Sequence, residues 1–171
     1  LIGLVGSEMC IRDRVEQHLP GDCLALWLPD LNHAPEHLAC QAVWLQRLFS
    51  KRLWIGVELL LRGDDLRKLR FLQRLGEQYA IPLCATGGVY MHVPSRRIVQ
   101  DTVTAIRLRR AINELGLEGE CNAQRHLRSR KQLAKLYPPT LLAATTEIAD
   151  RCKFSLDELR YEYPEELVPP E

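Results

Sequence analysis

Residues 53–86, LWIGVELLLRGDDLRKLRFLQRLGEQYAIPLCAT, decide the fold. The run at 53–61 is almost entirely apolar, which predicts a buried strand. Residues 65–80 carry leucines at every third position, which predicts an amphipathic helix, and Pro82 marks its end. A second apolar run at 83–86 predicts the next strand. Strand, helix and strand of these lengths form a right-handed βαβ unit, so we expect the two strands to pair in parallel.

Similar patterns on both sides of this unit extend the α/β prediction. An apolar run at 23–28 predicts one more strand, and a one-sided apolar pattern predicts a helix over 35–51. After Pro94 the pattern is helical throughout. The expected helices cover 95–108, capped by Ser95; 123–136, capped by Asn122; and 140–152, opened by a proline pair.

The chain is expected to divide into four parts. Residues 1–14, LIGLVGSEMCIRDR, lack the basic leading region and cleavage site of a signal peptide. They resemble a translated sequencing adapter, so we expect a non-native leader and a native protein that continues further on the N-terminal side. A partial α/β domain over 15–108, a helical segment over 109–153 that completes it, and an extended linker over 154–171 are expected to follow.

The bulk composition is that of an ordinary globular protein. Apolar residues make up 46% of the 171 residues and charged residues 26%, and the net charge is +1. No run approaches the roughly 18 consecutive apolar residues that cross a bilayer. These properties predict a cytoplasmic protein that has no membrane partner.

The six cysteines are scattered without a C-x-x-C pair or a histidine at ligand spacing. This pattern argues against a zinc module and against a disulfide framework. Two of them, Cys23 and Cys84, lie within predicted strands. We therefore expect the cysteines to be small buried apolar residues in a reducing compartment.

The region after the βαβ unit, LCATGGVYMHVPSRR at 83–97, is the one place where a site could form, because parallel strands place binding groups at their carboxyl ends. It is nevertheless poor in ligands. Thr86, Tyr90 and His92 are the side chains that can contact a metal or a phosphate, and His92 on a turn can equally be a polar cap.

Two other polar features have structural interpretations. Glu58 lies in an apolar strand, and an arginine partner is a better explanation for it than a role at a barrel mouth. His18, His33 and His37 cluster loosely near the N-terminus. Because Pro35 interrupts the spacing between the last two, a metal-ligand pair is not expected there.

Basic residues outnumber acidic ones between 96 and 135, whereas the segment from 157 onward is acidic. Arginine side chains match phosphate oxygens without reading bases, so this block can line a groove for DNA. The competing interpretation is a solvated helix face or a contact with neighbouring domains, since aromatic residues are not interleaved. The candidate contacts are Arg107, Arg109, Arg110, Arg125, Arg128, Arg130 and Lys131.

Three strings carry a family resemblance: ATGGVYMHVPSRR at 85–97 followed by QDTVTAIRL at 100–108, NAQRHLRSR at 122–130, and RCKFSLDELRYEYPEE at 151–166. In order and spacing they resemble the error-prone bacterial DNA polymerases, which are family C relatives of the replicative polymerase III alpha subunit. The resemblance runs from about residue 15 to the end. It implies the later part of an N-terminal polymerase and histidinol phosphatase (PHP) domain, a distorted (β/α) barrel, with residues 154–171 leading toward a polymerase palm that lies outside this chain.

The resemblance also implies that a metal site is lost. The family pattern after the strand is Thr-Gly-Asp-Val-His-Met-His, in which the aspartate and the first histidine bind metal. Those two positions are Gly88 and Tyr90 here, and a protonated phenol does not replace an imidazole ligand. His92 is the remaining weak candidate. We expect no cofactor for this chain and Mg²⁺ for the parent polymerase.

The implied function is that of a fragment of an error-prone, translesion DNA polymerase, a nucleotidyltransferase of DNA replication and damage-induced repair synthesis. The fragment itself is expected to be an inactive structural or interaction domain. Its expected partners are the rest of the polymerase chain, DNA through the parent enzyme, and translesion accessory proteins. Two alternatives remain open: a free-standing PHP-type metal-dependent phosphoesterase, and a binding module for a polymerase partner.

Overall fold

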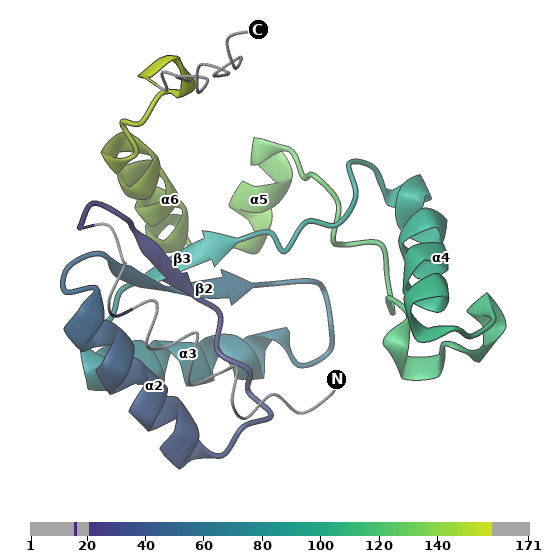
Figure 1. Cartoon of the computed structure of the whole chain (residues 1–171), viewed down its shortest axis with the longest axis horizontal. Coiled ribbons are helices and arrows are strands. Elements are labelled where there is room, and N and C mark those ends of the chain that lie inside the picture. Colours follow the sequence, from purple (N-terminus) through teal and green to yellow (C-terminus); the bar gives the residue numbers. More distant parts are fainter. Residues whose placement is uncertain (1–15, 17–20, 159–171) are drawn as a thin grey trace, which may run out of the picture.

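A computed structural model describes Glu16 and residues 21–158 of the chain. Its centre is a three-stranded parallel sheet in the order β1-β2-β3, formed by β1 (Ala25–Trp27), β2 (Leu53–Glu58) and β3 (Leu83–Thr86) (Figure 1). Ile55 of β2 pairs with Trp27 on one side and Leu83 on the other. The parallel βαβ unit predicted over 53–86 is therefore confirmed, with α3 (Asp65–Tyr79) as its crossover.

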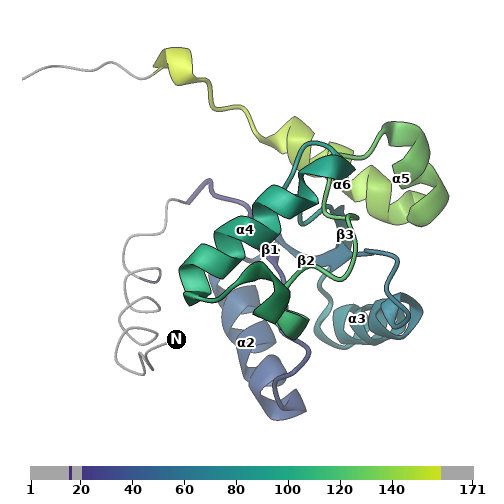
Figure 2. The same cartoon turned by 90° about the vertical axis from the view of Figure 1, so that its right-hand side faces the viewer.

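The two crossover helices, α2 (Pro35–Leu48) and α3, lie on the same side of the sheet (Figures 1 and 2). Alternate residues of a strand face opposite sides, and Ile55 and Val57 of β2 face these helices. Both are almost completely buried, in one cluster with α2 residues such as Leu38 and α3 residues such as Leu72. This cluster is the apolar core of the described chain.

The later helices follow β3. Helix α6 (Pro139–Arg151) packs along β3 and is preceded by the short α5 (Arg130–Leu136). Tyr137 and Leu141, which lie between and within these helices, join the core. On the opposite face of β2, the Arg151 guanidinium lies 5.0 Å from the centre of the Trp54 ring. Helix α6 therefore contacts β3 and, through Arg151, the Trp54 side chain of β2.

Helix α4 (Arg97–Leu108) stands apart from the sheet (Figures 1 and 2). It follows the 3-10 turn Pro94–Arg96 and precedes two more, Ile112–Glu114 and Gly116–Glu118. Helix α4 and these turns, residues 94–118, form an arm. The segments on either side of this α4 arm, around Met91 and around Leu127, run side by side. The Leu127 amide donates to the Met91 carbonyl at 3.1 Å, and a bridge joins Met91 to His126.

The helix predicted over 123–136 is wrong in its first half. The Asn122 side chain accepts a hydrogen bond from the Gln124 amide and donates one to the Leu60 carbonyl at 2.8 Å, which ties it to the end of β2. The Arg125 carbonyl accepts from the amides of Tyr90 and Met91 instead of a helical partner. Helix α5 therefore begins only at Arg130, where Ser129 and Gln132 form a capping box.

The other boundaries differ less from the predictions. Ser95 caps no helix: it lies inside a 3-10 turn, and α4 begins at Arg97 without a side-chain cap. The strand predicted over 53–61 ends at Glu58 because the backbone turns away, with Leu61 at a φ of 53°. Helix α6 begins one residue early, at Pro139. The leader at 1–14, His18 and most of the predicted linker (residues 159–171) lie outside the described residues.

The expectation of buried cysteines holds for Cys84 alone among the described residues. Its burial in β3 raises the pKa of the thiol. Cys23, Cys40, Cys121 and Cys152 are exposed, and Cys23 is exposed because β1 starts only at Ala25, two residues after it. In the part of the chain that the structure describes, no helix is long and apolar enough to cross a membrane.

Candidate functional site

Three segments meet at the carboxyl edge of the sheet, where parallel-strand folds place their binding groups. Strand β2 ends there at Glu58 and β3 ends at Thr86. The third segment is 120–128, which returns from the α4 arm across both strand ends. Its central side chain is Arg125, which lies among groups from all three segments.

The Arg125 guanidinium is surrounded by acceptors. Nη1 lies 3.2 Å from Glu58 Oε2 and donates to the Gly88 carbonyl at 2.9 Å, and Nε lies 3.4 Å from Glu120 Oε1. The Tyr90 ring covers it, with its centroid 4.6 Å from Cζ. The side chain is only 13% exposed. The arginine partner predicted for Glu58 is thus confirmed. Arg125 also contacts the Gly88 carbonyl, Glu120 and the Tyr90 ring.

Gly88 provides the space that this arrangement needs. Its φ is +51°, in the left-handed region that favours glycine. A Cβ atom on Gly88 would overlap Arg125 Nη1 and Glu58 Oε1 and would lie 2.7 Å from Glu58 Cδ. Any side chain at position 88 therefore competes directly with the ion pair. Positions 88 and 90, where the resemblance implies that metal ligands are lost, both lie against the same arginine.

A second set of hydrogen bonds fixes the strand ends behind this arginine. The Tyr137 hydroxyl accepts from the Leu59 amide at 2.9 Å and donates to the Thr86 carbonyl at 2.8 Å, so it bridges β2 and β3. Arg128 donates to the Leu59 carbonyl at 2.8 Å. Arg62 Nη2 reaches Glu120 at 3.3 Å, which links the start of α3 to the same network. The strand ends are therefore closed by side chains from the returning segment and by Tyr137, which lies between α5 and α6.

The structure separates the seven predicted phosphate contacts into three places. Arg125 and Arg128 are half-buried and engaged in the contacts above. Arg107, Arg109 and Arg110 are exposed at the end of α4, and Arg130 and Lys131 are exposed at the start of α5. Helices α4 and α5 lie apart from each other (Figure 1). DNA contact remains a prediction, and the exposed groups are the ones available for it.

The predicted ligand candidates do not come together. His92 is exposed, and Thr86 Oγ1 is buried without a hydrogen-bond partner. The His33 and His37 rings are neighbours with centroids 4.6 Å apart, and His37 Nε2 also contacts the Gln41 amide at 2.9 Å. Within residue 16 and residues 21–158, no three His, Cys, Asp or Glu side chains are placed to share a metal ion.

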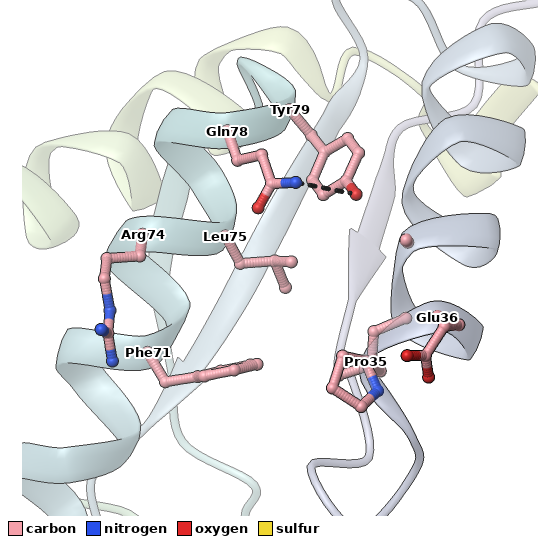
Figure 3. A pocket seen from close by; sticks show the side chains of 9 residues that line it. Pro35, Glu36, Phe71, Arg74, Leu75, Gln78 and Tyr79 are labelled. Carbon is pink, nitrogen blue, oxygen red and sulfur yellow. Dashed lines mark hydrogen bonds between the residues drawn. The ribbon is translucent and has the colours of Figure 1, made fainter.

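Two of the hollows on the described part of the chain lie near the features above. One, of about 510 Å³, lies beside Arg125 at the ends of β1 and β2 and is lined by both acidic and basic side chains, among them Asp30 and Lys68. The other, of about 490 Å³, is an outward groove between α2 and α3. Phe71 and Leu75 point into it from α3 and face Pro35 at the start of α2 (Figure 3). It is mainly apolar and carries no cluster of reactive groups.

Fold and site together define an α/β domain of parallel strands whose carboxyl edge is closed by a buried arginine. The chain is 49% identical over 164 residues to the error-prone DNA polymerase of Methylococcus capsulatus, which covers 96% of this chain and 15% of that protein. It is 51% identical over 148 residues to that of Dechloromonas aromatica, covering 86% of this chain and 14% of the relative. Against the Pseudomonas aeruginosa protein the identity is 43% over 164 residues. No model of a known protein family matches.

The predicted resemblance is therefore confirmed: the chain is homologous to one segment of the error-prone DNA polymerases. It spans only 14–16% of the length of the curated relatives that it matches.

Proposed function

We propose that this chain is the later part of the N-terminal domain of an error-prone DNA polymerase, and that it serves as a structural and interaction domain. The observation that carries the proposal is an identity of 42–51% along nearly the whole chain to proteins that are named for polymerase activity. Translesion synthesis and its Mg²⁺ chemistry would belong to the remaining length of the parent chain. There, metal ions neutralise the charge that develops on the transferred phosphate.

The sheet supports placing the chain in a (β/α) barrel. Its strands run in the chain order β1-β2-β3, and both crossover helices lie on one side (Figure 1). Doubly wound sheets instead reverse their strand order at a switch point and carry helices on both faces. A barrel adds each strand to the same edge with every helix outside. The preceding strands of such a barrel would pair with the outer edge of β1.

Arg125 supports the part of the proposal that concerns metal chemistry. A PHP-type site needs oxygen and nitrogen ligands facing an open centre. The two carboxylates around Arg125 are already paired with arginines, Glu58 with Arg125, and Glu120 with both Arg125 and Arg62. Position 88 provides no side chain, and Tyr90 stacks on the arginine. These residues do not fit a bound metal, and we propose no metal-dependent step for this chain.

Activity and metal assays of the purified chain test this function. We expect no primer extension with Mg²⁺, no hydrolysis of small phosphate esters, and substoichiometric transition metal by mass spectrometry. The full-length Methylococcus capsulatus polymerase, assayed for primer extension in parallel, is the positive control. Stoichiometric zinc or manganese together with phosphatase turnover would instead establish the free-standing phosphoesterase.

Binding to DNA is a further part of the proposal, and it rests on the exposed arginines at the end of α4. We expect Arg107→Glu combined with Arg110→Glu to weaken DNA binding by the chain. The slope of log K against log [salt] should fall by about 0.9 for each phosphate that the protein no longer neutralises. Binding is measured by fluorescence anisotropy between low and moderate salt.

The matched control for this change is Arg67→Glu combined with Arg70→Glu, which alters the net charge equally on exposed positions of α3. If both double variants weaken binding to the same extent, the effect is one of net charge, and a DNA groove at α4 is excluded.

A further inference from the structure

Helix α4 has a covered face that is mostly polar and an apolar face that is left open. Asp101, Thr104 and Ala105 are buried against the segment that follows the helix, where the Glu120 amide donates to Asp101 Oδ1 at 3.1 Å. On the opposite face Val99, Val103 and Ile106 are 46%, 55% and 71% exposed. Their spacing of four and three residues places them in one stripe along the helix.

An open stripe of this kind is unusual for a surface helix, which normally shows one apolar face and one polar face. Val99, Val103 and Ile106 are all β-branched, and such residues lower helix propensity, so they do not serve to stabilise an isolated helix. An amphipathic helix normally turns its apolar face toward a packing partner. In α4 the segment at 111–120 covers the face with Asp101 and Thr104, so the apolar stripe still lacks its partner among the described residues.

The charges at the two ends of the stripe define the chemistry of the missing neighbour. Arg96 is exposed near the start of the helix, and Arg107 and Arg110 are exposed at its end. A complementary surface therefore needs an apolar centre with carboxylates on its borders. Two copies of α4 placed stripe to stripe would bring arginines together in either orientation, which charge repulsion disfavours. The apolar centre in turn disfavours a nucleic-acid backbone as the occupant.

We propose that this stripe is a docking surface for another part of the same polymerase chain, an apolar segment bordered by acidic residues that lies outside residues 1–171. The inference rests on the proposed function, and it goes beyond that function by assigning the contact to one face of one helix. The matched relatives leave 84–86% of their length outside the segment that this chain covers. Helix α4 stands away from the sheet (Figure 1), and the side chains of the stripe are exposed, so a separate domain can reach them.

The test uses a full-length chimaera in which this chain replaces the matching segment of the Methylococcus capsulatus polymerase. Hydrogen exchange of the peptide that covers 97–108 is compared between the chimaera and the isolated chain. We expect exchange at least tenfold slower in the chimaera. Val103→Glu combined with Ile106→Glu should abolish that protection there and leave the thermal midpoint of the isolated chain unchanged. Leu66→Glu, at an exposed position of α3, is the control and should change neither result.

Three outcomes would overturn the inference. If the peptide 97–108 exchanges equally fast in the chimaera and in the isolated chain, and the chimaera extends primers, docking is rejected while the proposed function stands. A folded chimaera that cannot extend primers would reject the proposed function, and the docking inference with it. Protection of 97–108 in the isolated chain that disappears on dilution would assign the stripe to a second copy of this chain.

Discussion

Gly88→Ala is expected to destabilise the domain by about 2–5 kcal/mol, although it adds a single methyl group. Part of this cost is conformational, because a non-glycine residue held at a left-handed φ costs roughly 1–2 kcal/mol. The rest is steric, because the new Cβ overlaps Arg125 and Glu58, and overpacking of a filled site costs about 1–3 kcal/mol. Urea unfolding followed by tryptophan fluorescence measures the change.

Gly116→Ala separates the two contributions. Gly116 has a φ of +53°, close to that of Gly88, but no atom lies within 4 Å of the position that its Cβ would occupy. Gly116→Ala therefore incurs the conformational cost alone. The difference in unfolding free energy between the two variants measures the cost of crowding around Arg125. Equal losses for the two would show that Arg125 and Glu58 move aside freely, which would contradict the tightly filled site described above.

The same crowding bears on the proposal that a metal ligand is lost at position 88. Gly88→Asp introduces a carboxylate where Arg125 Nη1 and Glu58 Oε1 already lie. While Arg125 is present, the new carboxylate meets a guanidinium instead of an open coordination site. Restoring one ligand is therefore not expected to restore metal binding.

The elements that could be predicted from the sequence are those specified by local patterns. Strand β3 is confirmed without change, and α3 ends one residue before the predicted boundary, because apolar spacing and Pro82 act over a few neighbouring residues. The failure at 123–129 has a non-local cause. There the backbone pairs with Tyr90 and Met91, and no short-range signal indicates that partner.

The candidate site was predictable to a similar degree. A single glutamate at the end of an apolar strand indicates a basic partner, and Glu58 has one. Which arginine it would be could not be read from spacing, because Arg125 returns to the strand ends only after the whole α4 arm. The same limit applies to the predicted DNA groove. Nothing in the sequence distinguishes Arg125 and Arg128 from the other basic residues. In the structure their guanidinium groups bind Glu58 and the Leu59 carbonyl at the end of β2.

Arg125→Met is expected to cost about 2–3 kcal/mol of folding free energy. Methionine keeps most of the side-chain volume but leaves Glu58 and Glu120 without their shared cation. Breaking a buried ion pair by removing one partner costs about 3–5 kcal/mol. We expect less here because the carboxylate side chains are 25% and 16% exposed, and water screens part of the interaction. Arg62→Met, which removes a single ion pair of a more exposed arginine with the same Glu120, should cost below about 1 kcal/mol.

The origin of the loss can be tested by removing the carboxylates as well. If unpaired negative charge is the cause, Glu58→Gln combined with Glu120→Gln should restore a large part of the stability in the Arg125→Met background. The same two changes should destabilise the protein that retains Arg125, because the cation then loses its partners. Strict additivity of the three substitutions would mean that Arg125 acts only by packing. In that case its charge would not be what closes the carboxyl edge of the sheet.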